Sequence, residues 1–238
     1  MSIVVVTGTG TGVGKTVVTA AIAALAADRG ARVAVVKPAQ TGVGPAELGD
    51  VDLVRDLSGV TDVHEFARYP DPLAPATAAR VSGRPPLDLG AAAESVRRLA
   101  ADRRLVLVEG AGGLLVRFDD SGATLADLAR MLRAPLLVVT SAGLGSLNAT
   151  ALTLEAAAHR GLDLAGLVIG AWPAEPALAC RTNLVDFELL AARPLAGAIP
   201  DGAGLLPTDE FLAVARASLE PALGGTFDAA AFRSQHAQ

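Results

Sequence analysis

Short apolar runs rich in β-branched residues alternate along this chain with longer amphipathic stretches. Continuous apolar runs are typical of strands in a sheet that is buried on both faces, and we expect strands at 3–6, 33–36, 105–108, 136–139, 164–169 and 195–199. Helical patterns lie between them, at about 16–29, 88–101, 124–132, 147–160 and 176–191. This alternation predicts an α/β fold, a doubly wound and mostly parallel sheet of the P-loop NTPase type with helices on both faces.

The sheet pattern predicts one domain over residues 1–224. A stretch punctuated by prolines at 69–86 is interpreted as a surface connection, and residues 225–238 are expected to form a loosely ordered tail. Ligands of such sheets bind at the carboxyl ends of the strands. We therefore expect one crevice formed by the segments 7–16, 37–42, 109–113, 140–148, 170–173 and 200–204.

Composition narrows the choice of ligand. The 238 residues carry a net charge of −5, and no block of Lys or Arg offers a surface to nucleic acid or to an anionic membrane. A single cysteine and three scattered histidines exclude an intrachain disulfide and give too few ligands for zinc. The start of the chain lacks a secretory pattern, and we expect a cytoplasmic protein that acts on small molecules.

A glycine-rich loop follows the first apolar run and precedes the first helix. Its sequence, GTGTGVGKT at 8–16, is typical of a phosphate-binding P-loop. Backbone N–H groups of such a loop face the phosphates, Lys15 neutralises them, and the Thr16 hydroxyl can ligate Mg²⁺. Thr9 stands where the strict motif has glycine, so the first glycine is Gly8. A simple chain reversal is the alternative, but the Gly-Lys-Thr ending favours a nucleotide site.

Two charged residues stand at strand ends. Lys37 ends the second expected strand, and we expect it at a solvent crevice, where its replacement would stop turnover and leave the fold intact. A solvated lysine that caps the sheet is the alternative. Glu109 ends the third strand, at the place of a Walker B acid. A carboxylate there is costly to bury unless it meets a cation, which favours a role as Mg²⁺ ligand.

Two helix starts offer further polar groups. Asp50, Asp52 and Asp56 open a helical segment, where they can either stabilise the helix or supply a metal ligand, and sequence alone does not separate them. The segment 143–148 precedes another helix, whose N-terminal amides suit a carboxylate. Plain capping by Ser146 or Asn148 is the alternative there.

Four segments together carry a family resemblance: TGTGTGVGKT at 7–16, KPAQTG at 37–42, VEGAGG at 108–113 and LGSLN at 144–148. The chain resembles the dethiobiotin synthetase family over nearly its whole length. The resemblance implies a ligase of biotin biosynthesis. In this family 7,8-diaminopelargonic acid is carbamylated by CO₂, the carbamate is phosphorylated by ATP, and the second amine closes a cyclic urea with loss of phosphate.

The resemblance also implies roles for single residues. Lys15 and Lys37 would be catalytic by stabilising charge during phosphoryl transfer, and Thr16, Asp52 and Glu109 would hold Mg²⁺. Asp52 is preferred to Asp50 because the family's acid directly precedes an aliphatic residue that opens a helix. The implied nucleotide site comprises Gly12, Val13, Gly14, Lys15, Thr16, Val17, Asp52, Glu109, Gly110, Ala111, Gly112, Gly170, Ala171, Pro200, Asp201 and Gly202.

For the second substrate, the resemblance implies a hydroxyl contact from Thr41 and a carboxylate site on a homodimer interface. That site comprises Gly145, Ser146, Leu147 and Asn148, and an intrachain role for this patch is the alternative.

The chain departs from the family pattern in two places. Relatives often have an asparagine that reads adenine where this chain has Gly170 and Ala171, and they often have a histidine at the position of Ala149. With backbone groups left to recognise the base, we expect relaxed nucleotide choice, in which CTP or another triphosphate competes with ATP.

Two rival functions share features of this sequence. Nucleotide switches of the partitioning or septum-positioning kind usually carry an extra lysine early in the P-loop, where this chain has Gly10. Amide-forming P-loop ligases generally require a glutaminase domain with a catalytic cysteine. Cys180 lies in a helical pattern with no histidine nearby, which is typical of a buried apolar position.

Overall fold

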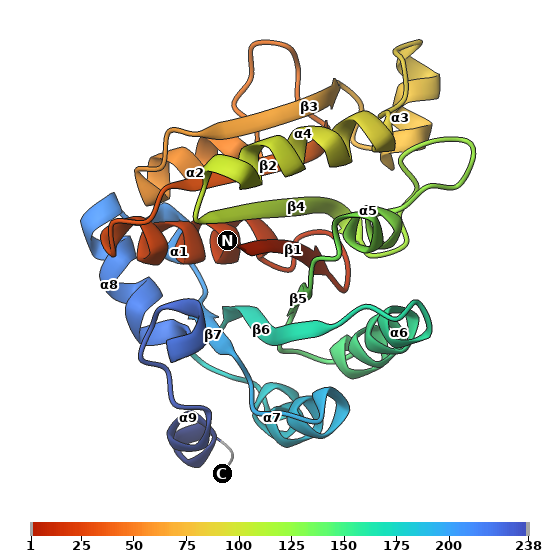
Figure 1. Ribbon diagram of the computed structural model, residues 1–238. Helices are drawn as coiled ribbons and strands as arrows, with labels where there is room; N and C mark the ends of the chain where they lie inside the picture. Colours follow the sequence, from red (N-terminus) through yellow and green to blue (C-terminus); the bar gives the residue numbers. More distant parts are fainter. Residues whose placement is uncertain (1, 237–238) are drawn as a thin grey trace.

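A single parallel sheet organises the computed structural model, which describes residues 2–236 (Figure 1). Its seven strands lie in the order β3-β2-β4-β1-β5-β6-β7, and all neighbouring strands are parallel. The strands are β1 Ser2–Gly8, β2 Val33–Thr41, β3 Val63–Tyr69, β4 Leu105–Gly113, β5 Leu136–Thr140, β6 Leu164–Trp172 and β7 Gly197–Pro200. The expected doubly wound α/β fold is confirmed.

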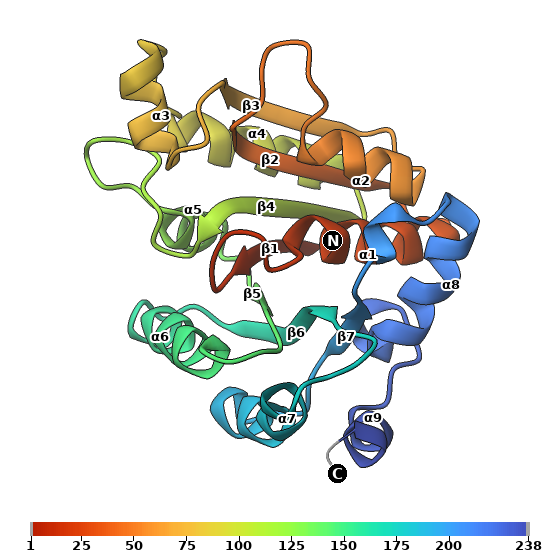
Figure 2. The same cartoon turned by 180° about the vertical axis from the view of Figure 1, so that it is seen from behind.

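Helices cover both faces of the sheet, as Figures 1 and 2 show from opposite sides. The α-helices are α1 Lys15–Asp28, α2 Asp50–Ser58, α3 Pro75–Ser82, α4 Leu89–Asp102, α5 Leu125–Leu132, α6 Ser146–His159, α7 Leu178–Ala191, α8 Thr208–Ser218 and α9 Ala229–His236. Short 3₁₀ turns occur at Ala203–Leu205 and Pro221–Leu223.

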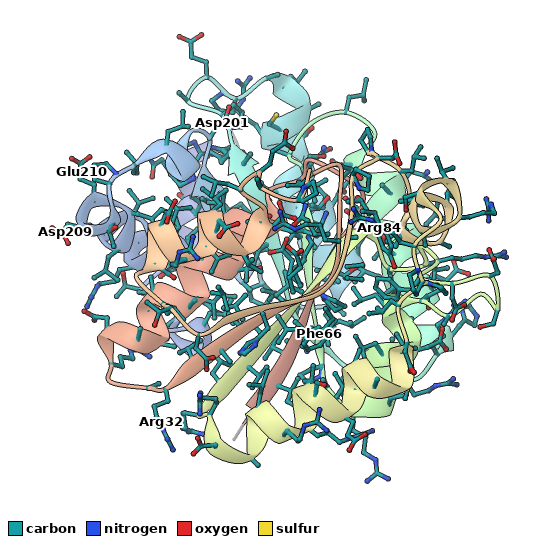
Figure 3. All side chains as sticks on the ribbon, turned by 90° about the horizontal axis from the view of Figure 1, so that it is seen from above. Arg32, Phe66, Arg84, Asp201, Asp209 and Glu210 are labelled. Atoms are coloured by element: carbon teal, nitrogen blue, oxygen red, sulfur yellow. The ribbon has the colours of Figure 1, made fainter. Side chains whose placement is uncertain are left out.

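Two hydrophobic cores result, one on each face. Alternate side chains of a strand point to opposite faces, so Val106 and Val108 enter one core while Leu107 enters the other. Helices α1, α2 and α8 close the core around Leu107, and α3, α4, α5, α6 and α7 close the core around Val106. The polar sides of the helices face outward, as Asp209 and Glu210 of α8 do at the perimeter in Figure 3.

Strand β3 is the one strand that the hydrophobic pattern does not predict. It lies at an edge of the sheet, and all but one of its residues are only half-buried. Its sequence, VHEFARY, therefore mixes charged and apolar side chains instead of forming an apolar run.

The proline-rich stretch is also more ordered than a plain surface connection. Pro75 begins α3, where a proline costs no hydrogen bond, and the Tyr69 hydroxyl donates to the Pro85 carbonyl at 2.9 Å. This stretch folds over the carboxyl ends of β2 and β3, where it borders the cavity described below.

The chain end differs from the expected loose tail. Asp228 accepts hydrogen bonds from the amides of Ala230 and Ala231 and so caps α9, which packs beside α7 (Figures 1 and 2). Phe227 is buried in the core and Phe232 packs against it. Only residues 237–238 of the expected tail lie outside the described part of the chain. No helix within residues 2–236 is both long and apolar enough to cross a membrane.

Candidate active site

A cavity of about 580 Å³ opens at the carboxyl ends of β1, β2 and β4. Parallel strands place their following loops at this edge, which is why segments distant in sequence meet there. The lining residues are Thr11, Gly12, Gly14, Lys15, Thr16, Val17, Lys37, Gln40, Thr41, Asp50, Pro72, Leu73, Ala74, Pro75, Glu109, Ala111, Gly112 and Val116.

The P-loop forms one wall of this cavity. Gly12 and Gly14 have φ angles of 75° and 93°, in the left-handed region that glycine adopts at little cost. The Lys15 ammonium donates to the Gly10 carbonyl at 2.8 Å, across the mouth of the loop. Burial, with a smaller contribution from the charge of Lys37, lowers the pKa of Lys15. A bound phosphate would provide a negative counter-charge for this ammonium.

Lys37 lies at the centre of the site. Its Nζ is 2.8 Å from Glu109 Oε1, 2.5 Å from Asp50 Oδ2 and 3.0 Å from the Gly110 carbonyl. Burial acts to lower the pKa of Lys37, but the charges and hydrogen bonds of Glu109 and Asp50 together outweigh it and raise that pKa. Lys37 is therefore charged, with its ammonium held at a fixed point.

Lys37 lines the cavity as expected, but the expected solvent exposure is wrong, because Lys37 is only 3% exposed and Glu109 only 2%. Removing the ammonium would leave a buried carboxylate without its cation, so Lys37 also supports the fold. Lys37 and Glu109 also do not end their strands as expected, because β2 continues to Thr41 and β4 to Gly113. The charged partners of Lys37 come from β4 and α2.

The structure separates the two candidate carboxylates of α2. Asp50 lines the cavity and contacts Lys37. Asp52 points elsewhere: its carboxylate accepts the amide of Gly49 at 2.8 Å and pairs with Arg55 at 2.6 Å. The Gly49 hydrogen bond, followed by that of Arg55, lowers the pKa of Asp52 against its burial. Asp52 thus closes the capping box of α2, and Asp50 takes the position at the site that was expected of Asp52.

Gln40 is a site residue that the sequence reasoning missed. It is 4% exposed, and its side-chain oxygen accepts the amide of Asp50 at 3.0 Å. Its side-chain nitrogen donates to the Thr41 carbonyl at 3.2 Å. Gln40 therefore ties the start of α2 to the end of β2. Gln40 lies within the KPAQTG motif and next to Thr41, so the motif itself could have indicated that Gln40 belongs to the site.

Oxygen atoms suited to a divalent cation gather beside Lys37. The Thr16 hydroxyl donates to Glu109 Oε1 at 2.9 Å, and Asp50 faces the same cavity. Hydroxyl and carboxylate oxygens with phosphates and water are the ligands that Mg²⁺ takes at nucleotide sites. Within residues 2–236, no group of three or more His, Cys, Asp or Glu side chains forms a metal site by itself. The donor set therefore fits Mg²⁺ carried with a nucleotide.

An apolar wall forms part of the cavity lining. Pro72, Leu73, Ala74, Pro75 and Val116 supply its side chains. Thr41, the last residue of β2, also lines the cavity. One cavity thus joins a phosphate loop, a buried ammonium and a surface suited to an aliphatic chain.

The ends of β6 and β7 lie beside the P-loop and outside the cavity wall. A Cβ on Gly170 would overlap the Val13 carbonyl oxygen, and a Cβ on Gly14 would overlap the Gly170 carbonyl. Gly170 and Ala171 sit at a register shift, because three residue steps on β6, from Ile169 to Trp172, face two on β7. At this bulge the backbone of β6 lies against the backbone of the P-loop, and only glycine at positions 14 and 170 permits so close an approach.

The remaining predicted nucleotide residues are distributed as follows. Val13 packs in a core, and the Gly110 carbonyl accepts a hydrogen bond from Lys37 while its Cα faces Leu125. Pro200 ends β7, Asp201 and Gly202 follow it, and the Asp201 amide donates to the Trp172 carbonyl at 2.8 Å.

The segment 145–148 lies outside the cavity, at the start of α6. Gly145, and neither Ser146 nor Asn148, occupies the N-cap position. The Ser146 hydroxyl donates to the Gly143 carbonyl at 2.5 Å, and the buried Asn183 amide donates to the carbonyls of Ala142 and Gly143. The Ser146 amide also donates to the Gly143 carbonyl at 3.3 Å, so several hydrogen bonds hold this loop.

Comparison with known proteins identifies the family. Residues 3–207 match the family model described as an AAA domain. The chain is 75% identical to the ATP-dependent dethiobiotin synthetase BioD of Frankia casuarinae over 236 residues, covering 99% of both chains. It is 57% identical to the protein of the same name from Streptomyces coelicolor, again covering 99% of both.

Among solved structures, the septum site-determining protein MinD of Pyrococcus horikoshii, complexed with Mg-ADP, superposes with a TM-score of 0.53. That alignment covers 90% of this chain and 94% of that one at 18% identity, which shows a shared fold alone. The full-length identity to the synthetases decides between the two groups. The chain belongs to the ATP-dependent dethiobiotin synthetase family.

Proposed function

We propose that this protein uses ATP to convert 7,8-diaminopelargonic acid and CO₂ into dethiobiotin, ADP and phosphate. The observation that carries the proposal is the position of Lys37, a buried ammonium that faces both the P-loop and the apolar wall. A carbamate formed on the diamine would meet Lys37, the aliphatic chain would lie along Pro72–Pro75, and the triphosphate would bind the P-loop.

Charge stabilisation by the two lysines is the main chemical contribution of the chain. The carbamate oxygen attacks the γ-phosphorus and ADP leaves; the second amine then attacks the carbamoyl carbon and phosphate leaves. Each step places negative charge on oxygens between Lys15 and Lys37, where fixed ammonium groups stabilise it without reorganising water. Lys15 exchanges its contact with the Gly10 carbonyl for a phosphate oxygen.

Thr16, Asp50 and Glu109 are the proposed Mg²⁺ ligands. Mg²⁺ bound with the nucleotide would neutralise phosphate charge at this position. Asp50 replaces Asp52 in this set because Asp50 faces the cavity and Asp52 caps α2.

The carboxylate of the diamine is assigned to the start of α6 of a second copy of the chain. Gly145 to Asn148 lie outside the cavity of their own chain, which supports a site completed across a homodimer. Leu144 and Leu152 are 96% and 58% exposed beside these amides, as is expected of a surface that pairs with another protein. The amides of Leu147 and Asn148, in the first turn of α6, would suit an anion.

The nucleotide base is assigned to the backbone around Gly170, Ala171 and the loop Pro200–Gly202. No side-chain amide stands at the first two positions, so the base would be held by backbone groups and shape. ATP is the co-substrate named for the relatives, and the weaker discrimination expected here leaves room for CTP or another triphosphate.

The reaction is tested by phosphate release from Mg-ATP and bicarbonate, with and without 7,8-diaminopelargonate. We expect release to depend on the diamine and the product to have the mass of dethiobiotin. Running the assay with CTP measures nucleotide choice. Release that ignores the diamine would instead support a nucleotide switch, and no release would point to another ligase.

The magnesium ligand on α2 is tested by comparing Asp50→Asn with Asp52→Asn. Asp50→Asn is expected to raise the Mg²⁺ concentration for half-maximal activity by about tenfold or more, because a ligand oxygen loses its charge. Asp52→Asn is expected to leave that concentration unchanged and to cost about 1 kcal/mol of stability through the weakened cap. The reverse pattern in a Mg²⁺ titration with thermal melts would restore Asp52 as the ligand.

The dimer is tested by placing a charge on its proposed surface. Leu144→Asp is expected to give a monomer in analytical ultracentrifugation and to raise KM for the diamine about tenfold, while ATP affinity is retained. Val81→Asp on α3 is the matched control, since Val81 is also exposed, at 62%, and lies away from α6. A Leu144→Asp protein that stays dimeric, or a monomer with unchanged KM, would contradict the assignment.

A further inference from the structure

The carboxyl end of β6 is held from two sides. On one side its backbone at Gly170 lies against Val13 and Gly14 of the P-loop. On the other side the Trp172 indole, 7% exposed, enters the core formed with α7. A single residue, Ala171, therefore separates a contact with the phosphate loop from a contact with the helical layer.

Helix α9 supplies aromatic contacts to Trp172. The rings of Phe232 and His236 lie edge-on to the indole, with centroid distances of 5.1 and 5.2 Å. Phe227 packs against Phe232 at 5.2 Å, and Arg233 forms an ion pair with Glu188 of α7. These contacts dock the C-terminal helix on the end of β6, as its place beside α7 in Figure 2 shows.

The backbone of Trp172 extends this connection to the loop after β7. Trp172 pairs with Pro200, and its carbonyl accepts the Asp201 amide at 2.8 Å. Further along that loop, a Cβ on Gly204 would lie 3.1 Å from the Val17 side chain, at the start of α1. Trp172 thus joins α9 to both segments assigned to the nucleotide base.

We propose that α9 holds the nucleotide-binding loops in register through Trp172, which makes Trp172 and Phe232 positioning residues for ATP. The proposal rests on the proposed function, since it takes the ends of β6 and β7 as the base side of the ATP site. Because Gly170 and Ala171 provide no reading side chain, base binding depends on how rigidly their backbone is held. An undocked α9 would let the bulge and the Pro200–Gly202 loop move.

The effect is specific to one substrate. The apolar wall and Thr41 lie near β2 and β3. In the strand order, these two strands are on the opposite side of β1 from β6 and β7. Loosening of the β6 and β7 ends should therefore change ATP binding and leave Thr41 and the apolar wall, which are proposed to hold the diamine chain, as they are. If α9 had a purely structural role, substitutions that undock it would lower the stability of the protein and leave KM for ATP unchanged.

The experiment measures KM for ATP, KM for the diamine, kcat and melting temperature in the full-length Phe232→Ala protein. We expect KM for ATP to rise about fivefold or more, with the other two kinetic constants within about twofold. Phe232→Tyr, which keeps the ring, is expected to retain the native KM. Trp172→Phe is the second variant, with a smaller rise than Phe232→Ala because a ring remains in place.

Phe66→Ala is the matched control for lost packing. Phe66 lies in β3 at the other edge of the sheet and is half-buried against the same core (Figure 3). It is expected to lower the melting temperature without changing KM for ATP. An unchanged KM for ATP in Phe232→Ala, measured well below its melting temperature, would overturn the proposal.

Calorimetric titration with a non-hydrolysable ATP analogue separates this inference from the reaction itself. If the native protein binds the analogue but makes no dethiobiotin, the proposed function fails while the comparison of analogue affinities still tests α9. A loss of affinity in Phe232→Ala would support the positioning role in that case as well, and equal affinities would reject it.

Discussion

The ion cluster of Lys37 with Glu109 and Asp50 is the interaction on which the site depends. It joins β2 and β4 to the start of α2, and its three residues line the cavity. A buried charge is stable only with compensating partners, so each member fixes the others. The same compensation holds an ammonium ready for the anionic groups of the proposed reaction. Stability and chemistry therefore share one set of contacts.

Strands that are buried on both faces of the sheet can be predicted from the sequence. Residues 105–108 of β4 are apolar because helices cover both faces there, and the pattern predicts this half of the strand, whereas the half from Glu109 to Gly113 has no apolar pattern. Strand β3 carries charged residues because it lies at an edge, so periodicity did not reveal it. The order of α9 depends on Phe232 meeting Trp172, a contact between residues distant in sequence, which no local pattern contains.

The site residues could likewise be predicted where local sequence places them, and not where contacts between distant segments do. Residues that lie within a continuous motif, such as Lys15 and Thr16, could be assigned because local backbone geometry places them. The choice between Asp50 and Asp52 could not, since it depends on which side of α2 faces β2. The fold is shared with MinD at 18% identity, so the sheet alone does not distinguish a synthetase from a nucleotide switch. The distinction lies in the residues that border the cavity.

The most direct measurement compares Lys37→Gln with the double variant Lys37→Gln/Glu109→Gln, by chemical denaturation and by dethiobiotin formation. The single change should cost about 3–5 kcal/mol of stability, because it leaves the Glu109 carboxylate buried without a cation. The double variant should recover much of that loss, since the uncompensated charge is gone, while both proteins make no product. A single variant as stable as the native protein, or a double variant that turns over, would contradict the account.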